Sequence, residues 1–433
     1  MNLKRLLFTL SSLLIFANCF GYDLPDVITN DVYSDNIRTV QLYREGWALS
    51  SPVIVLNSDQ KLAFNFDDLS AEVKNYYYTV YHCDRNWKIS NIPQQEYLEP
   101  FTEFPLEDFE FSIVPLVRYV NYFLSLPNDN VKFRYSGNYA IVVYDKDSPG
   151  EPLITWRMYV VEPLVTIDAR IRNATFQDTE AEFQEVDFIV EHKNFPIQNP
   201  SRDVKVVVMQ NNRHDNAITK LTPRFADDEL LEYDYNEGNS FNGENEFRDF
   251  EFRNYKYVSE EVQDISFHRS VYHVTLKPDL LRTSDRYTFD EDLNGRYHIE
   301  AYQSYYPEVE ADYMFVHFTL PMDNILLGGG VYVFGELSNW QCNKQNEMKW
   351  NMEKNQYELT MLLKQGFYNY VYAWKDISDG KVRTYAFEGS HFETENDYQI
   401  FVYHGRINDR FDRLIGYQKF NSLNNRAFST KRF

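Results

Sequence analysis

The sequence predicts an all-β protein built from several β-sandwich domains. Tyr and Phe are unusually frequent, with 34 and 33 residues, and aromatic and β-branched side chains favour strands over helices. Short runs of such residues recur along the chain and are separated by turn residues, a spacing that is typical of sandwiches. Amphipathic helical stretches are scarce. The clearest strand patterns cover residues 62–66, 76–81, 139–144, 156–161, 186–190 and 204–209.

The N-terminus has the features of an export signal. Two basic residues at positions 4 and 5 precede an apolar run over residues 6–17, which is shorter than the roughly 20 residues that a membrane-spanning helix needs. Small residues before Tyr22 predict cleavage there, so residues 1–21 form the predicted signal peptide. Acylation of Cys19, as in a lipoprotein, is the alternative. Either way, the sequence predicts a mature protein outside the cytoplasm, in the periplasm.

Proline-bearing stretches suggest two domain boundaries. One predicted strand stops at Glu162-Pro163, and a second break follows Pro321, just before a triple glycine at 328–330. The predicted division is an N-terminal β-sandwich domain over 22–162, a middle β-domain over 163–322, and a C-terminal immunoglobulin-like domain with a C-terminal tail over 323–433.

Charge and cysteine content limit the classes of partner. The formal net charge is −22, which argues against nucleic acid, because phosphate binding needs clustered Lys and Arg. It also disfavours adsorption to anionic lipid. After removal of the signal peptide only Cys83 and Cys342 remain, and two distant cysteines do not form a disulfide framework. We expect two unpaired thiols.

The sequence contains no catalytic or cofactor-binding pattern. A phosphate-binding Gly-x-x-x-x-Gly-Lys loop, a Gly-x-Ser-x-Gly elbow and a His-Glu-x-x-His helix are all missing. His82 and Cys83 are neighbours on a predicted strand, so their side chains point to opposite faces and cannot readily share a metal ion. We therefore predict no catalytic residues, no metal and no cofactor.

A calcium loop is one open alternative to this prediction. Within Asp290–Asn294, Asp290, Asp292 and Asn294 occupy alternate positions before Gly295, as at the start of such a loop. The closing Glu belongs at position 12, which here is Ala301, and Glu300 is one residue away. An acidic turn leading into a strand is the favoured interpretation.

The last predicted domain resembles the immunoglobulin-like sandwich of glycogen- and starch-binding modules. The resemblance covers about residues 331–374 and includes a strand and turn ending at Trp340. In that family an exposed Trp stacks on a sugar ring, which makes a periplasmic glycan-binding protein the alternative function. The aromatic residues of this domain are our candidates for partner contact, and packing inside the domain is the favoured interpretation of each. They are Trp340, Tyr370, Tyr372 and Trp374.

A wider resemblance covers most of the chain, from about residue 31 to residue 417. Several separate stretches, in the right order, are similar to the plug protein of type IX secretion. They are Asp31-Val32-Tyr33, Ile37-Arg38-Thr39-Val40, residues 75–84, Leu126-Pro127-Asn128, residues 136–139, residues 184–188, residues 210–213, residues 243–248 and residues 393–398. One departure is Gly243-Glu244-Asn245, where a second glycine is expected.

The resemblance implies a specific role. Proteins of this family lie on the periplasmic side of the outer membrane and close the inner mouth of the SprA-type translocon barrel when it is idle. They have no catalytic motif that could be carried over. A third class, a β-sandwich hydrolase that uses scattered carboxylates, has no residues at a defined spacing to support it.

Overall fold

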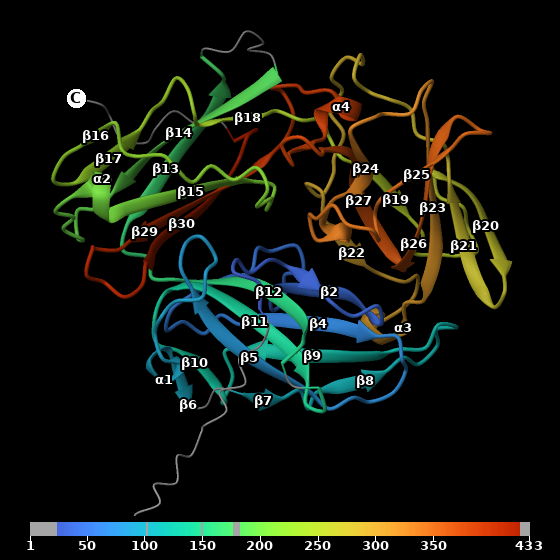
Figure 1. Ribbon diagram of the computed structural model, residues 1–433, viewed down its shortest axis with the longest axis horizontal. Coiled ribbons are helices and arrows are strands. Elements are labelled where there is room, and N and C mark those ends of the chain that lie inside the picture. The colour runs from blue at the N-terminus through green and yellow to red at the C-terminus, as the bar shows by residue number, and fades with distance from the viewer. Residues whose placement is uncertain (1–23, 101–102, 149, 176–181, 425–433) are drawn as a thin grey trace, which may run out of the picture.

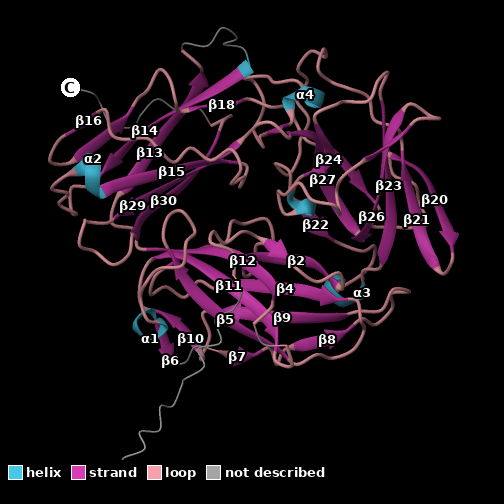
Figure 2. Ribbon diagram, in the orientation of Figure 1, coloured by secondary structure: helices cyan, strands magenta, loops and turns pink. Residues whose placement is uncertain are grey.

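The computed structural model describes residues 24–100, 103–148, 150–175 and 182–424, and within them the protein is almost entirely β (Figure 2). Its helices are single turns, so the predicted all-β fold of several sandwiches is confirmed. No helix among these residues is long and apolar enough to cross a membrane. The predicted signal peptide and Cys19 lie outside the described residues. Cys83 and Cys342 are both unpaired.

The first sandwich consists of two antiparallel-rich sheets around one apolar core (Figure 1). One sheet contains β1 (Asp31–Val32), β12 (Pro152–Val161), β11 (Gly137–Asp145), β5 (Tyr76–Cys83), β7 (Phe104–Pro105) and β3 (Val53–Val55). The facing sheet contains β2 (Ile37–Arg44), β4 (Leu62–Asp68), β9 (Val120–Leu126) and β8 (Phe109–Phe111). Helix α1 (Gln94–Tyr97) and the pair β6 (Leu98–Pro100) and β10 (Val131–Phe133) lie at one end.

The second sandwich is discontinuous in sequence. Its outer sheet contains β13 (Thr166–Asn173), β14 (Phe183–Glu191), β17 (Leu230–Tyr233), β16 (Phe225–Ala226) and β18 (Ser240–Asn242). Its inner sheet contains β15 (Val204–Gln210), β29 (Asp397–His404) and β30 (Arg413–Asn421), and α2 (Pro200–Asp203) precedes β15. In Figure 1 the last two strands, in red, lie beside the green strands although they are nearly 200 residues later in the chain.

In sequence, the third sandwich lies between the two segments of the second sandwich, which are β13–β18 and β29–β30. One sheet is built on the long strand β27 (Gly366–Asp376), which pairs with β19 (Arg248–Glu251), β22 (Tyr297–Ile299), β24 (Gly329–Phe334) and β28 (Val382–Arg383). The other contains β20 (Val262–His268), β21 (Val271–Leu276), β23 (Tyr313–Pro321), β26 (Gln356–Lys364) and β25 (Lys349–Asn351). Two single turns, α3 (Pro307–Glu310) and α4 (Tyr385–Glu388), and a 3₁₀ helix at Glu336–Ser338 complete it.

The sheets do not follow the predicted boundary between residues 322 and 323. Strand β23 ends at Pro321 but pairs along its whole length with β26, which lies beyond that boundary. Strands β29 and β30 are predicted to belong to the C-terminal domain, but β29 pairs with β15 of the second sandwich and β30 pairs with β29. The proline marks the end of a strand, and local sequence carries no signal for pairing between strands so far apart. By contrast, β12 ends at Val161, next to the predicted boundary at 162.

The first and second sandwiches form one continuous stack of four sheets. Strand β29 is buried on both faces because Ile400 packs into the core of the second sandwich, whereas Phe401 packs against the first. The Phe401 ring stacks on Tyr159 of β12 with ring centres 4.4 Å apart. A shared apolar core of this kind resists relative movement far better than a flexible linker.

A buried polar junction joins the third sandwich to the first. Lys364, at the end of β26, forms an ion pair with Asp67 of β4 at 2.6 Å, and both side chains are at most 2% exposed. Tyr313 of β23 donates a hydrogen bond to the same carboxylate at 2.6 Å. The Lys364 ammonium also lies 4.2 Å from the centre of the Tyr119 ring. Burial lowers the pKa of Lys364, and the charge of Asp67 opposes this effect.

Candidate docking surface

A group of exposed apolar side chains lies where the first and third sandwiches meet. We call it the junction face. The first sandwich contributes Phe109, Phe111, Ile113, Val114, Leu116 and Phe123. The third contributes Tyr255, Tyr257, Tyr302, Tyr305 and Tyr306. Soluble proteins rarely expose so many large apolar side chains together unless the surface binds something.

Two shallow hollows connect the two halves of the junction face. One, of about 550 Å³, is lined by Val114 and Leu116 from the first sandwich and by Tyr255 and Tyr302 from the third. The other, of about 510 Å³, places Phe109 and Phe123 next to Tyr306. The apolar residues therefore form one surface that only the assembled fold can create.

The segment 112–118 is exposed, but backbone hydrogen bonds to the third sandwich fix its conformation. The carboxylate of Asp312 accepts hydrogen bonds from the backbone N–H groups of Leu116 and Val117, at 2.9 and 3.1 Å. The N–H of Ile113 donates to the carbonyl of Val309 at 3.0 Å. Residues of the third sandwich thus fix a loop of the first sandwich, which reduces the conformational entropy that would be lost when a partner binds.

A second carboxylate fixes the tyrosine loop of the same face. Glu310 accepts a hydrogen bond from the Ser304 hydroxyl at 2.5 Å, and weaker ones from the N–H groups of Tyr305 and Tyr306. The Ser304 hydroxyl and the Tyr306 N–H lower the pKa of Glu310, so this acceptor stays ionised. Tyr305 and Tyr306 are 90% and 65% exposed on a loop of defined conformation. Tyr side chains give large contact area at small entropic cost.

Charged side chains border the apolar centre. Asp108, Glu110 and Glu308 line one hollow, while the other is lined by Glu310 together with Arg253 and Lys256. An apolar centre with a charged rim is the usual organisation of a protein–protein interface. The acidic side of the rim, at the first hollow, indicates a partner segment in which apolar side chains are flanked by Lys or Arg.

Replacing Asp312 by alanine is expected to loosen the 112–118 segment. The substitution removes the acceptor for three backbone N–H groups, those of Leu116, Val117 and Tyr313, so the amides of Leu116 and Val117 should exchange with solvent faster in hydrogen–deuterium exchange. The free energy of unfolding should fall by about 1–3 kcal/mol, the usual cost of leaving buried donors without a partner. Asp323→Ala, at an exposed position, is the control. Unchanged exchange at both amides would contradict the assigned role of Asp312.

Comparison with known proteins decides the family. A sequence model of the type 9 secretion system plug protein 1st domain matches residues 37–162. The chain belongs to the type IX secretion system plug protein family. The match covers most of the first sandwich, including the part of the junction face that this sandwich contributes.

A solved structure is similar to this chain over almost its whole length. The crystal structure of a hypothetical protein from Parabacteroides merdae ATCC 43184, at 2.30 Å resolution, is 40% identical in sequence, with a TM-score of 0.89. The similarity covers 91% of this chain and 99% of that one. No curated protein matches the chain. Family membership associates this plug protein with the type IX secretion system of the bacterial envelope.

The aromatic residues predicted as partner contacts lie away from the junction face. Tyr370 and Tyr372 are only 3% and 0% exposed, and both hydroxyls donate to the carboxylate of Asp279 at 2.6 Å. Such buried rings cannot contact a docked partner, because they point into the core between the two sheets of the third sandwich. Trp374 is half-buried against the same core.

Trp340 does not present an open platform for a sugar ring. It is half-buried, and its ring packs edge-on against Phe334 and Phe247, with ring centres 5.4 and 6.0 Å away. In the neighbouring acidic turn, backbone N–H groups of the protein already bind the carboxylate of Asp292. Asp292 accepts hydrogen bonds from the N–H groups of Phe247 and Asn294 at 2.5 and 2.6 Å, as expected for an acidic turn.

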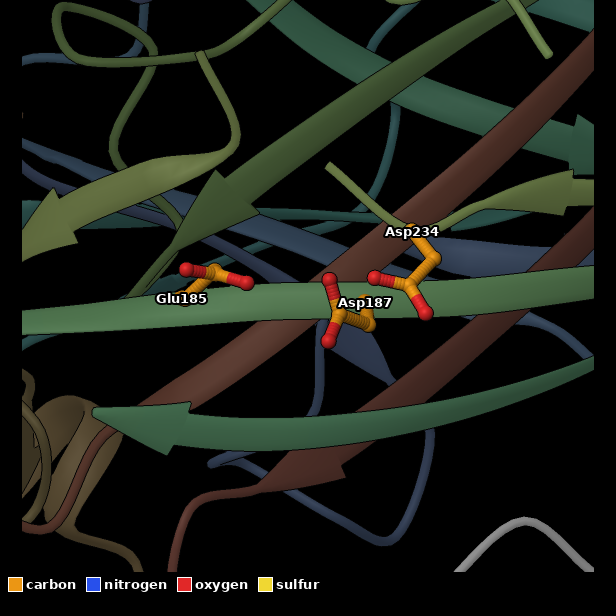
Figure 3. Close-up of side chains that lie close together, drawn as sticks. All are labelled: Glu185, Asp187 and Asp234. Carbon is orange, nitrogen blue, oxygen red and sulfur yellow. The ribbon is translucent and has the colours of Figure 1, made fainter. Parts of the chain in front are cut away.

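A cluster of three carboxylates in the second sandwich has a different role. The oxygens of Glu185, Asp187 and Asp234 approach one another within 4.8 Å (Figure 3). The Arg172 guanidinium binds Glu185 at 2.6 Å and Asp187 at 2.7 Å, and it lies 3.7 Å from Asp234. Arg170 adds a second positive charge beside Asp187. Two guanidinium groups thus offset most of the negative charge of the three carboxylates, which leaves the cluster with a structural role.

Replacing Arg172 by methionine is expected to destabilise the plug protein by about 2 kcal/mol, less than for a fully buried pair because Arg172 is 30% exposed. The cause is that Glu185 and Asp187 lose their main counter-charge while their side chains stay buried. Calcium at millimolar concentration should leave the melting temperature of the wild type unchanged, because the guanidinium occupies the site. A calcium-dependent rise in the wild-type melting temperature would overturn this assignment.

Proposed function

We propose that this chain is a non-enzymatic plug subunit that docks on the periplasmic opening of the SprA-type translocon barrel and closes it while no cargo is engaged. The match to the plug family carries the proposal. The junction face supports it, because it is a broad, fixed and partly apolar surface of the kind that proteins use for docking.

The construction of the molecule suits closure of a wide pore. A stopper has to keep its shape against a large opening, and the shared apolar core of the first two sandwiches provides a rigid body. The buried Lys364–Asp67 pair fixes the third sandwich to it. Arg213 of the second sandwich also lies 5.2 Å from the centre of the Phe334 ring of the third. Every sandwich is thus tied to the others.

The charged rim gives a reason why docking can be reversible. An interface with a modest apolar centre and a hydrated, charged border binds specifically without becoming permanent. The barrel would then present apolar side chains among Lys or Arg around its periplasmic opening. Attraction across such a border weakens as salt screens the charges, so association should slow as ionic strength rises.

Affinity purification tests the proposal. A tagged version of the full chain, expressed in its own cells, should recover the translocon barrel when the envelope is solubilised with mild detergent. A deletion strain should admit compounds that the outer membrane normally excludes. Reproducible loss of the barrel from the purified material, together with an equally tight envelope in the deletion strain, would refute the proposed function.

A further inference from the structure

Three of the nine histidines form a row on the outer face of the third sandwich. His268 lies on β20, His273 on β21 and His317 on β23, which are adjacent strands at the outer edge of the molecule in Figure 1. His273 is paired with Ser266 and Phe315. Because residues two apart on a strand point to the same face, all three imidazoles emerge on one side of the sheet. That side is opposite the apolar core, which contains Val274 and Val316.

Two of these imidazoles lie edge to edge. The His273 Nδ1 atom is 2.9 Å from the Nε2 atom of His317, and the two ring planes differ by 6° with ring centres 5.2 Å apart. The ring of His268 follows on the other side of His273, with centres 5.6 Å apart. Two nitrogen atoms therefore face each other. The ligand atoms of the three histidines do not all lie within 4.8 Å of one another, so His268 would have to rotate its side chain to join the pair.

A hydroxyl group orients the last imidazole of the row. The Nδ1 atom of His317 lies 2.9 Å from the Thr360 hydroxyl of β26. When this hydroxyl accepts the Nδ1 proton, the lone pair of His317 is left on Nε2, the atom that faces His273. A hydrogen bond from the second ring nitrogen to a protein acceptor is the usual arrangement for histidines that bind metal. In that tautomer, the nitrogen of His317 that faces His273 is the one able to bind a metal ion.

We propose that His273 and His317 bind one divalent transition-metal ion of the class that prefers imidazole, represented by Cu²⁺ and Zn²⁺, with His268 as an additional ligand. Nitrogen ligands at 2.0–2.1 Å in a tetrahedral site are about 3.3 Å apart, so the two nitrogen atoms have to separate by about 0.4 Å and both rings have to tilt until their lone pairs point at the ion. On binding, the proton shared between the two rings moves to the Nε2 atom of His273 through water. The metal then replaces the hydrogen bond, and no electron transfer is involved.

The local chemistry selects this class of ion. Imidazole nitrogen suits copper, zinc and nickel, whereas calcium and magnesium require oxygen ligands. Structural need does not account for the row, because a hydrogen bond between solvent-accessible imidazoles replaces bonds to water and stabilises a fold only slightly.

Calorimetric titration of the full mature chain, purified without a polyhistidine tag, tests the proposal. With CuCl₂ or ZnCl₂ at pH 7.5 we expect one ion per chain at this site, and electron paramagnetic resonance of the Cu²⁺ form should show coupling to imidazole nitrogen. His273→Gln and His317→Gln should each weaken binding at least about tenfold, while His298→Gln, on another sheet, should not. Binding should also weaken as the pH falls below about 6, where imidazole is protonated.

Two outcomes would overturn the proposal. One is the absence of heat or spectral change with either ion in the wild type. The other is a double variant, His273→Gln with His317→Gln, that binds both ions as tightly as the wild type. The side chains are solvent-accessible, so circular dichroism should show that each variant remains folded. Neither outcome depends on whether the chain docks on the translocon.

Discussion

Replacing Lys364 by methionine is expected to lower the free energy of unfolding by about 3–5 kcal/mol, because it leaves a buried carboxylate without its counter-charge. Asp67 is 1% exposed, and its partners after the substitution would be only the hydroxyl of Tyr313 and the amide of Asn121. These neutral donors cannot replace an ammonium at 2.6 Å. Chemical denaturation followed by Trp fluorescence measures the change.

A matched control separates burial from charge. Lys354 pairs with Glu358 at 3.1 Å on the surface, and its side chain is 63% exposed. Lys354→Met should change the free energy of unfolding by less than about 1 kcal/mol, as is usual for exposed ion pairs. The double variant Lys364→Met with Asp67→Asn should lose less than the sum of its single variants. A cost below about 1 kcal/mol for Lys364→Met would show that the junction is not fixed by this pair.

Introducing a charge into the junction face is expected to weaken docking on the translocon at least about 30-fold, which corresponds to about 2 kcal/mol. Val114 is 72% exposed, so Val114→Glu should leave the fold intact while it places a carboxylate in the apolar centre of the contact. The new charge would have to lose its hydration in the complex without a partner. Binding of purified variants to the barrel in detergent, followed by surface plasmon resonance, measures the effect.

The second sandwich offers the matched control for this prediction. Ile407 is 80% exposed on the turn between β29 and β30, away from the junction face. Ile407→Glu adds the same charge to an equally exposed aliphatic position, and it should leave the affinity unchanged. Equal losses for both variants would indicate a general effect of charge, and no loss for Val114→Glu would place the contact elsewhere.

Strand positions could be predicted from the sequence because they depend on local pattern. Residues 76–81 form an aromatic and β-branched run, and β5 occupies Tyr76–Cys83. The same holds for residues 204–209 and β15. The pairing of β15 with β29 could not be predicted, since the two strands are nearly 200 residues apart and no local property links them.

The docking surface could not be predicted from the sequence for a related reason. The candidates Tyr370 and Tyr372 are aromatic residues of one strand, for which the sequence favours core packing over partner contact, and both rings lie in the core of the third sandwich. The residues that are exposed, such as Val114 and Tyr305, sit in loops with no regular pattern. Only the fold brings residues 109–116 next to residues 302–306, and Asp312 then fixes them.

Site-specific photocrosslinking in living cells tests the central claim most directly. A photoreactive amino acid at position 114, within the junction face, should produce a covalent adduct that contains the translocon barrel, and the same group at position 407 should not. The adduct should be abundant in idle cells and should decrease when cargo is engaged. A barrel adduct from position 407 with none from position 114, or no barrel adduct from any position on the junction face, would contradict the account.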